Sequence, residues 1–420
     1  MITRIHAREV LDSRGLPTVQ VEVHCRDGAS GSAIVPAGAS TGKAEAHELR
    51  DGDPARYDGR GMLKAVANVN QVLGPAVLGR DPREQAAIDG LLCRLDGTPQ
   101  KSQLGGNAIL GVSLAVAHAA AAAQKLPLYR HLNLLWRQIA GEADCRMPLP
   151  MTNLISGGLH AGGNLDFQDF LIMPLGAESY RAGLEWIVRV YRRLATLLSE
   201  AGYEGRLVAD EGGLGPRLPS NRAAIEFIVR AIEAAGLRPG DDVTIALDVA
   251  STHFYDGTHY RLQATGGQRL TSGQMIQQLE ELVAAFPIAS IEDGLAEDDW
   301  SGWQELTRRL GERVRLVGDD LFATNPERIK RGIELGAANS VLIKLNQIGT
   351  LTETLQAMRV ARSAGYGCVV SARSGESEDA TIADLAVATA ADLIKIGSIQ
   401  RSERLAKYNR LLAIEESLHP

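Results

Sequence analysis

The pattern of apolar positions in the first third of the chain favours strands followed by helices. Runs rich in β-branched residues predict strands at 2–10, at 18–25 and around 32–35. Apolar positions at helical spacing then predict helices near 60–73, 82–95 and 107–124. Because the strands and the helices are segregated, this part of the chain is expected to form its own α+β domain.

From about Met147 onward, strand-like and helical segments alternate. Two strand candidates, at 149–155 and 167–173, precede a long helical stretch at 180–201. Six strand-then-helix units follow, with strands near 243–248, 288–292, 314–319, 340–344, 367–371 and 392–396. Eight strands is the number that closes a parallel-type barrel. The segment 208–211 would be a ninth strand, but the glycines and the proline after it indicate a connection instead.

These patterns divide the chain into an N-terminal α+β domain at 1–135, a connection at 136–146 and a (β/α)8-type barrel at 147–420. The longest apolar run, at 108–123, is rich in alanine and is interrupted by Ser113 and His118. It is shorter than the roughly 20 residues that a membrane-spanning helix needs. We therefore interpret this run as a buried helix of a globular protein.

The composition narrows the classes of partner and compartment. The chain carries a net charge of -7 with both signs interspersed, which gives it no bulk attraction for nucleic acid or for anionic lipid. An anionic substrate would therefore need a local cationic or metal site. The four cysteines are far apart and form no CxxC pair, and no apolar segment of the signal-peptide type follows Met1. A cytoplasmic protein without disulfides is expected.

Charged residues occur at the carboxyl ends of the predicted barrel strands, where barrel active sites are assembled. In chain order they are Asp248, Glu292, Asp319, Lys344, Arg373 and Lys395. Carboxylates from three successive strands can surround Mg²⁺, which prefers oxygen ligands. The three cations after them suit an anionic substrate that bridges to such a metal. A single acid after a strand is ordinary, but six charges in step with the barrel period are not.

Among these residues Lys344 is the natural proton acceptor. An ammonium group near other cations has a lowered pKa, and it can then act as a base. The proton beside a carboxylate is very weakly acidic, so the resulting ene-diolate would need metal ions and Lys395 to stabilise its charge. The alternative is that Lys344 only forms a salt bridge with a metal-site carboxylate.

Three glycine-bracketed loops carry further polar groups. The segment 210–213 offers Glu211 on a flexible connection, where a general acid could approach a leaving hydroxyl group. The segment 157–163 brackets His160 with glycines, which is typical of a mobile lid. The segment 38–42 resembles a closing loop whose Ser40 could reach a metal or a phosphate. Taken singly, each of the three is equally well an ordinary turn or loop.

Longer motifs make the chain resemble the enolase family. The matching segments run from residue 2 to about 416 and include 11–15, 38–42, 106–113, 290–293, 317–321, 342–350 and 401–416. The resemblance implies a small α+β lid domain on a barrel whose first units are irregular. It also implies reversible, Mg²⁺-dependent dehydration of 2-phosphoglycerate to phosphoenolpyruvate, usually by a homodimer or a higher homo-oligomer. The expected partner is thus a small phosphorylated carboxylate.

The resemblance also implies roles for individual residues, all of them carried over by matched motif. Asp248, Glu292 and Asp319 would hold the first of two Mg²⁺ ions, and Ser40 would contribute to the second. Lys344 would be the base, Glu211 would assist the departing hydroxide, and Asp169 and His160 would complete the catalytic set. Arg373 and Ser374 would bind phosphate, Lys395 would bind the carboxylate, and Gln168 and Ala39 would also contact substrate.

Several positions depart from the family pattern. Ala372 stands where enolases have an active-site histidine, and Asp169 stands where they have a glutamate that is one methylene longer. Ala37, Ala209 and Ile396 replace a usual serine, glycine and threonine. The base, the metal ligands and the phosphate-binding residues are kept, so binding and enolisation are expected to survive. The leaving-group half of the reaction is expected to differ.

Three interpretations follow from these departures. The first is a divergent enolase that acts on 2-phosphoglycerate. The second is an enolase homologue of phosphonate or phosphinate biosynthesis, similar to carboxyphosphonoenolpyruvate synthase, which the space left by Ala372 favours. The third is an inactive scaffold or binding protein. The third is disfavoured by Lys344, Glu211 and the three metal carboxylates. A protein that had lost its activity would not be expected to keep all of them.

Overall fold

A computed structural model describes residues 1–38, 42–141, 143–264 and 266–418. The predicted substrate contact at Ala39 and the predicted metal ligand Ser40 lie outside the described residues.

The N-terminal part contains an antiparallel sheet of β1 (Ile2–Leu11), β2 (Pro17–Cys25) and β3 (Ser30–Ile34), in that order. Helix α4 (Gly106–Ala123) packs against β2 and β3. It can approach closely because Gly31 has no side chain: a Cβ there would lie 2.2 Å from the Ala119 nitrogen. Although α4 is long and apolar enough to cross a membrane, 83% of it is buried in the protein. The interpretation of this run as a buried helix is confirmed.

The other N-terminal helices are α1 (Leu63–Asn68), α2 (Gly74–Val77), α3 (Gln85–Asp96) and α5 (Leu128–Ala140). A π-helical turn, Val69–Leu73, joins α1 to α2, and the Gly74 amide donates to the Val69 carbonyl five residues back. Pro75 follows at once, and its ring cannot donate to a preceding carbonyl, which accounts for a local change of hydrogen-bond register. Helix α5 was not predicted, although its buried apolar residues recur at helical spacing.

The C-terminal part contains a closed barrel of eight strands. In barrel order these are β4 (Leu149–Ser156), β5 (Asp169–Met173), β6 (Thr244–Asp248), β9 (Ile288–Glu292), β10 (Arg315–Gly318), β11 (Ser340–Ile343), β12 (Gly367–Ser371) and β13 (Leu393–Gly397). The predicted number of strands is confirmed, and the segment 208–211 lies outside the barrel as predicted. The barrel is of the predicted parallel type except at β5, which is antiparallel to β4 and β6, in keeping with the irregular first units that the resemblance implied. The connection from β4 to β5, residues 157–168, contains only the 3-10 helix Gly158–Ala161 and no long crossover helix, so β5 returns in the opposite direction.

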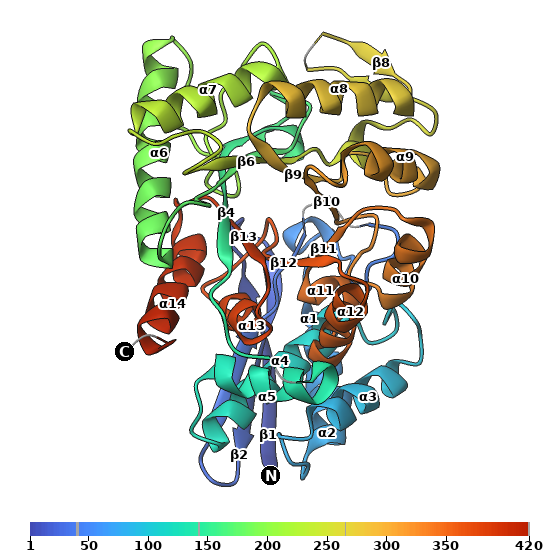
Figure 1. The fold of residues 1–420 in the computed structure, drawn as a ribbon. Helices are drawn as coiled ribbons and strands as arrows, with labels where there is room; N and C mark the ends of the chain where they lie inside the picture. Colours follow the sequence, from blue (N-terminus) through green and yellow to red (C-terminus); the bar gives the residue numbers. More distant parts are fainter. Residues whose placement is uncertain (39–41, 142, 265, 419–420) are drawn as a thin grey trace.

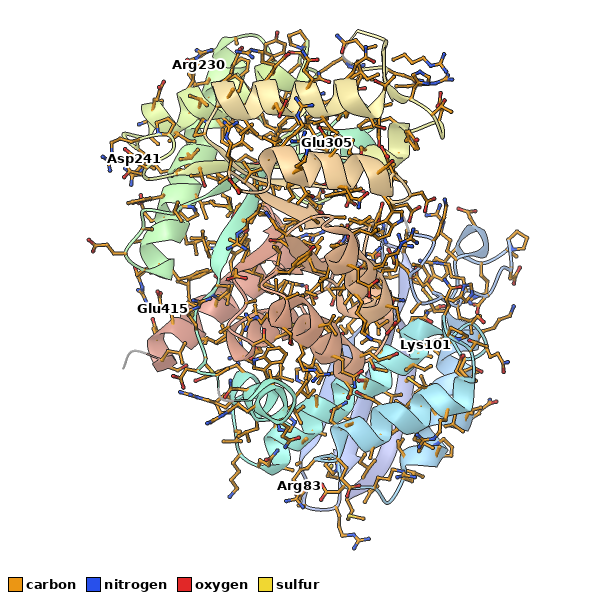
Figure 2. The ribbon with its side chains drawn as sticks, turned by 45° about the vertical axis from the view of Figure 1, so that its right-hand side comes forward. Arg83, Lys101, Arg230, Asp241, Glu305 and Glu415 are labelled. Carbon is orange, nitrogen blue, oxygen red and sulfur yellow. The ribbon has the colours of Figure 1, made fainter. Side chains whose placement is uncertain are left out.

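Helices surround the barrel. They are α6 (Tyr180–Glu200), α7 (Asn221–Ala234), α8 (Ser272–Ala285), α9 (Trp300–Leu310), α10 (Pro326–Leu335), α12 (Leu351–Ser363), α13 (Thr381–Ala388) and α14 (Ser402–Leu418). In Figure 1 the N-terminal strands gather with α2 and α3 at one end of the molecule, while α7 and α8 lie at the other. Figure 2 shows charged side chains such as Arg83, Arg230 and Asp241 at the periphery of the ribbon.

The barrel interior is apolar between its two mouths. A cluster of buried side chains from the strands fills it: Met151, Leu171, Met173, Ala246, Val317, Leu342, Val369 and Leu393. Such inward-pointing layers make a barrel a packed core and not a pore.

Candidate active site

The predicted charged residues meet at the carboxyl ends of the barrel strands. Asp248 and Glu292 end β6 and β9, Asp319 and Lys344 directly follow β10 and β11, and Lys395 lies within β13. One cavity is lined by nine of the predicted site residues: His160, Gln168, Glu211, Asp248, Asp319, Lys344, Arg373, Ser374 and Lys395. Glu292 and Asp169 do not line this cavity, but each contacts a residue that does.

Two lysines pair with the three carboxylates that were predicted to bind metal. The Lys395 ammonium lies 2.7 Å from Asp248 Oδ2 and 2.8 Å from both carboxylate oxygens of Glu292. The Lys344 ammonium lies 2.5 Å from Asp319 Oδ2. These contacts hold three carboxylates from adjacent strands within one buried charge network.

The carboxylates carry more negative charge than the lysines neutralise. Burial and the charge of Asp248 raise the pKa of Glu292 well above its usual range. Burial also raises the pKa of Asp293, together with the charges of Asp320 and Asp319. Carboxylate oxygens of Asp293, Asp319 and Asp320 lie within 4.8 Å of one another. This surplus of buried oxygen ligands suits a hard divalent cation.

Asp293 and Asp320 were not among the predicted site residues. The two oxygens of Asp293 accept the backbone amides of Asp319 and Asp320, at 2.9 and 2.8 Å, and so fix the turn after β10. Asp293 has a positive φ of 42°, which is uncommon for a residue other than glycine. The acidic pairs at 292–293 and 319–320 were the signal in the sequence that could have found them.

The environment of Lys344 differs from the expectation. Neighbouring cations were expected to lower its pKa, but the pKa is raised. Burial and the charge of Arg373 do act to lower it, but the carboxylates around the ammonium, Asp319 first and then Glu292, together outweigh them. Sequence reasoning counted the cations at the strand ends and missed the direct contact between the ammonium and this carboxylate.

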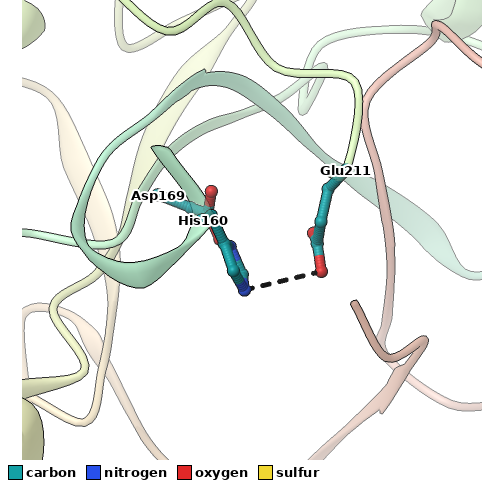
Figure 3. Close-up of side chains that lie close together, drawn as sticks. All are labelled: His160, Asp169 and Glu211. Atoms are coloured by element: carbon teal, nitrogen blue, oxygen red, sulfur yellow. Dashed lines mark hydrogen bonds and ion pairs between the residues drawn. The ribbon is translucent and has the colours of Figure 1, made fainter. Parts of the chain in front are cut away.

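His160, on the cavity wall, lies between two carboxylates, and Figure 3 marks its contact with Glu211. Its Nδ1 lies 2.9 Å from Asp169 Oδ2, and its Nε2 lies 3.9 Å from Glu211 Oε1. Burial acts to lower the pKa of His160, but the charges of Asp169 and Glu211 outweigh burial and raise this pKa to about 9. The imidazole is therefore protonated at neutral pH and presents one N–H toward Glu211.

Hydrogen bonds hold both the side chain of Asp169 and the backbone of Glu211 in place. Asp169 Oδ1 accepts hydrogen bonds from the side-chain amide of Asn153 at 2.5 Å and from the Ser156 hydroxyl at 3.0 Å. The Glu211 carbonyl accepts the Ser398 amide at 2.9 Å, which ties the 208–214 connection to the end of β13. Glu211 therefore lies in a fixed position, although its segment is not a strand.

Arg373 and Ser374 lie after β12 and are held by residues of both domains. The Arg373 guanidinium contacts Glu45 Oε2 and Asn346 Oδ1, each at 2.9 Å. Arg404 donates to the carbonyls of Arg373 and Ser374, both at 2.7 Å. Sequence reasoning missed Glu45, Asn346 and Arg404, because the contacts join segments that lie far apart in the chain.

The wall of the cavity also includes Ala372, Gln168 and His253. The Ala372 amide donates to the Lys395 carbonyl at 2.8 Å, so its methyl group stands beside the charged cluster. Gln168 Nε2 donates to Asp248 Oδ2 at 3.1 Å. Burial lowers the pKa of His253, which leaves a neutral imidazole on this wall. No pattern in the sequence had marked His253.

Two family descriptions together match nearly the whole chain. Residues 2–132 match the enolase N-terminal domain, and residues 144–420 match the enolase C-terminal TIM barrel domain. These matches indicate a lyase-type enzyme of the enolase superfamily, and with the clustered acidic groups they suggest a divalent metal. The chain belongs to the enolase family.

Proposed function

We propose that this protein is a Mg²⁺-dependent lyase that reversibly dehydrates 2-phosphoglycerate to phosphoenolpyruvate. The observation that carries the proposal is that Lys344 and Glu211 line one buried cavity together with Arg373 and Lys395. A base, a leaving-group partner and two anion-binding cations are what a proton abstraction followed by loss of hydroxide requires.

The first half of the reaction is the removal of the proton beside the carboxylate. Lys344 accepts this proton, and Lys395 lies beside the developing ene-diolate charge. When bound, Mg²⁺ supplies positive charge at the substrate carboxylate, and Asp248, Glu292 and Asp319 are the residues that would hold it. A cation held by Asp319 would compete with the Lys344 ammonium for this carboxylate, and the pKa of Lys344 would then fall.

The phosphate end of the substrate meets Arg373 and Ser374. The guanidinium of Arg373 can bind two phosphate oxygens at once. Glu45 and Asn346 orient this side chain, and Arg404 fixes the backbone that carries it. Because Glu45 comes from the N-terminal domain, that domain contributes directly to the position of the phosphate.

The second half of the reaction is the departure of hydroxide. Ala372 offers no imidazole for this step, but His160 is protonated and directs Nε2 toward Glu211. His160 and Glu211 together can donate a proton to the leaving oxygen, so that it departs as water. Asp169 acts through His160 as a positioning residue, since it fixes the other ring nitrogen.

The direct test is the formation of phosphoenolpyruvate. Purified protein with Mg²⁺ and 2-phosphoglycerate is expected to develop the ultraviolet absorbance of the enol phosphate, and the K344M variant is not. An exposed-lysine variant, K330Q, serves as the matched control. Absence of product with the wild-type protein, at Mg²⁺ concentrations that saturate binding, would reject 2-phosphoglycerate as the substrate.

A second candidate is an enolase-like step in phosphonate or phosphinate biosynthesis. The observation that favours it is the methyl group of Ala372 on the cavity wall, which leaves space beside the leaving group. Phosphonate analogues of the substrate would then react faster than 2-phosphoglycerate. For an inactive scaffold, neither substrate would react and Mg²⁺ would not bind.

We also propose a cytoplasmic homodimer or higher homo-oligomer, as expected from the family resemblance. Sedimentation of the purified protein tests the oligomeric state. A sedimentation coefficient that corresponds to 45.0 kDa at all concentrations would reject it.

A further inference from the structure

A second cavity, of about 870 Å³, lies at the opposite mouth of the barrel. Its lining includes residues at the amino ends of four strands: Ala289, Arg315, Ser340 and Gly367. The candidate active site occupies the carboxyl ends of the same strands. The apolar cluster inside the barrel separates the two cavities, so a ligand here would not reach the catalytic groups.

This cavity is rich in arginine, although the chain as a whole has a net charge of -7. It is lined by four arginines and three acidic residues: Arg146, Arg313, Arg315, Arg362, Asp144, Glu312 and Asp392. Asp392 faces two of the guanidinium groups, at 3.7 Å from Arg146 and 3.8 Å from Arg315. These two distances exceed those of hydrogen-bonded ion pairs. Arg146 Nη2 also donates to the Ala390 carbonyl at 3.3 Å. The other guanidinium donors of Arg146, and those of Arg315, remain open to another anion.

The arginines divide into a structural one and three that face the cavity. Arg362 is the structural one. It donates to the Ala390 carbonyl at 2.5 Å, and its guanidinium packs over the ring of Trp136 in α5. The side chain of Arg313 is exposed and makes no hydrogen bond or ion pair within the described residues. The side chains of Arg146 and Arg315 are 64% and 39% exposed. All three can therefore turn toward a ligand.

The floor of the cavity is rigid and shaped around Arg315. A Cβ at position 367 would lie 2.1 Å from Arg315 Nη1, so glycine at this position makes room for the guanidinium. Asn339 donates to the carbonyls of Gly311 and Val314, at 2.9 and 3.1 Å, and so fixes the loop that carries Arg313. Because the backbone here is already held in place, only the arginine side chains lose freedom when a ligand binds.

We propose that this cavity binds a small oligophosphate, with Arg146, Arg313 and Arg315 as the phosphate donors. Guanidinium groups bind phosphate oxygens in pairs, and three of them at one cavity suit an anion with several phosphates. The volume is within the ordinary range of small-molecule sites, roughly 300–1,000 Å³. Inorganic tripolyphosphate and the triphosphate of a nucleotide share this chemistry.

The test is calorimetric titration of the full-length protein with tripolyphosphate and, separately, with ATP, in EDTA so that no metal complex forms. Tripolyphosphate is expected to bind, and R313Q is expected to lower its affinity by about tenfold or more, because a charged hydrogen-bond donor is lost. The R313Q/R315Q double variant is expected to bind still more weakly. Tighter binding of ATP than of tripolyphosphate would identify a nucleotide as the occupant, and equal binding would identify the oligophosphate alone.

Two control variants locate the binding. R193Q removes an exposed arginine of α6 that lies outside the cavity, and it is expected to leave the affinity unchanged. R373Q changes the catalytic cavity and is also expected to retain tripolyphosphate binding. Loss of binding in R373Q with full binding in R313Q would overturn the proposal, because the anion would then occupy the active site. No binding by the wild-type protein at millimolar tripolyphosphate would overturn it as well.

Discussion

The imidazole of His160 lies between two carboxylates that come from different segments, with Asp169 at 2.9 Å from one nitrogen and Glu211 at 3.9 Å from the other. Asp169 is the first residue of β5, and its carboxylate also accepts hydrogen bonds from Asn153 and Ser156. The shorter acid at position 169 therefore serves to hold a cationic imidazole in the cavity.

Replacing Asp169 with asparagine is expected to weaken this arrangement without changing the size of the side chain. The pKa of His160 should fall from about 9, because the neutral amide no longer stabilises the imidazolium. Titration of the ring by NMR measures the fall. Phosphoenolpyruvate formation should decrease by about 10²-fold. An unchanged pKa in D169N would show that Glu211 alone holds the proton.

The charge of His160 predicts a pH dependence of stability. The folded-state pKa of about 9 lies above the roughly 6.5 of an unfolded histidine, so the folded protein binds this proton more tightly. The stabilisation is present in full below about pH 6.5 and is lost as the pH rises through 9. H160Q should therefore lower the free energy of unfolding more at about pH 6 than at about pH 9.5. Urea unfolding at both values checks this, and an equal loss would contradict it.

When no metal is bound, the Lys395 ammonium is expected to neutralise the buried carboxylates of Asp248 and Glu292 in place of the metal. K395M would leave Asp248 and Glu292 buried without their cation, which should cost about 3–5 kcal/mol of stability in EDTA. Adding Mg²⁺ should restore more stability to K395M than it adds to the wild-type protein. Thermal unfolding with and without Mg²⁺ measures the difference, and K330Q is the control. A K395M variant as stable as wild type in EDTA would rule out this role.

Restoring an imidazole at position 372 separates the two halves of the proposed reaction. A372H places a proton-handling group on the cavity wall, so phosphoenolpyruvate formation should rise by about tenfold or more. Exchange of the proton beside the carboxylate should change little, because Lys344 performs that step. A372S is the matched control, since it is polar but carries no imidazole. If A372H abolished exchange as well, the space at Ala372 would serve the substrate and not the leaving group.

Local patterns predicted the number of barrel strands and the residues at their ends, because both depend on short-range sequence. The direction of β5 was not predictable in this way, since it depends on where the chain goes after β4. Contacts such as Arg373 with Glu45, 328 residues apart, were also invisible to local reasoning. The same holds for the pKa of Lys344, which is set by the distance from its ammonium to Asp319 and not by the count of nearby cations.

The measurement that tests the central claim most directly is solvent exchange at the carbon beside the substrate carboxylate. Wild-type protein, Mg²⁺ and 2-phosphoglycerate in deuterated water should incorporate deuterium at this carbon, as followed by NMR, and K344M should reduce the rate by about 10²-fold or more. That result would assign proton abstraction to Lys344 whatever the rate of hydroxide loss. Deuterium incorporation that is equally fast in wild type and K344M, or absent in both with Mg²⁺ bound, would contradict the account.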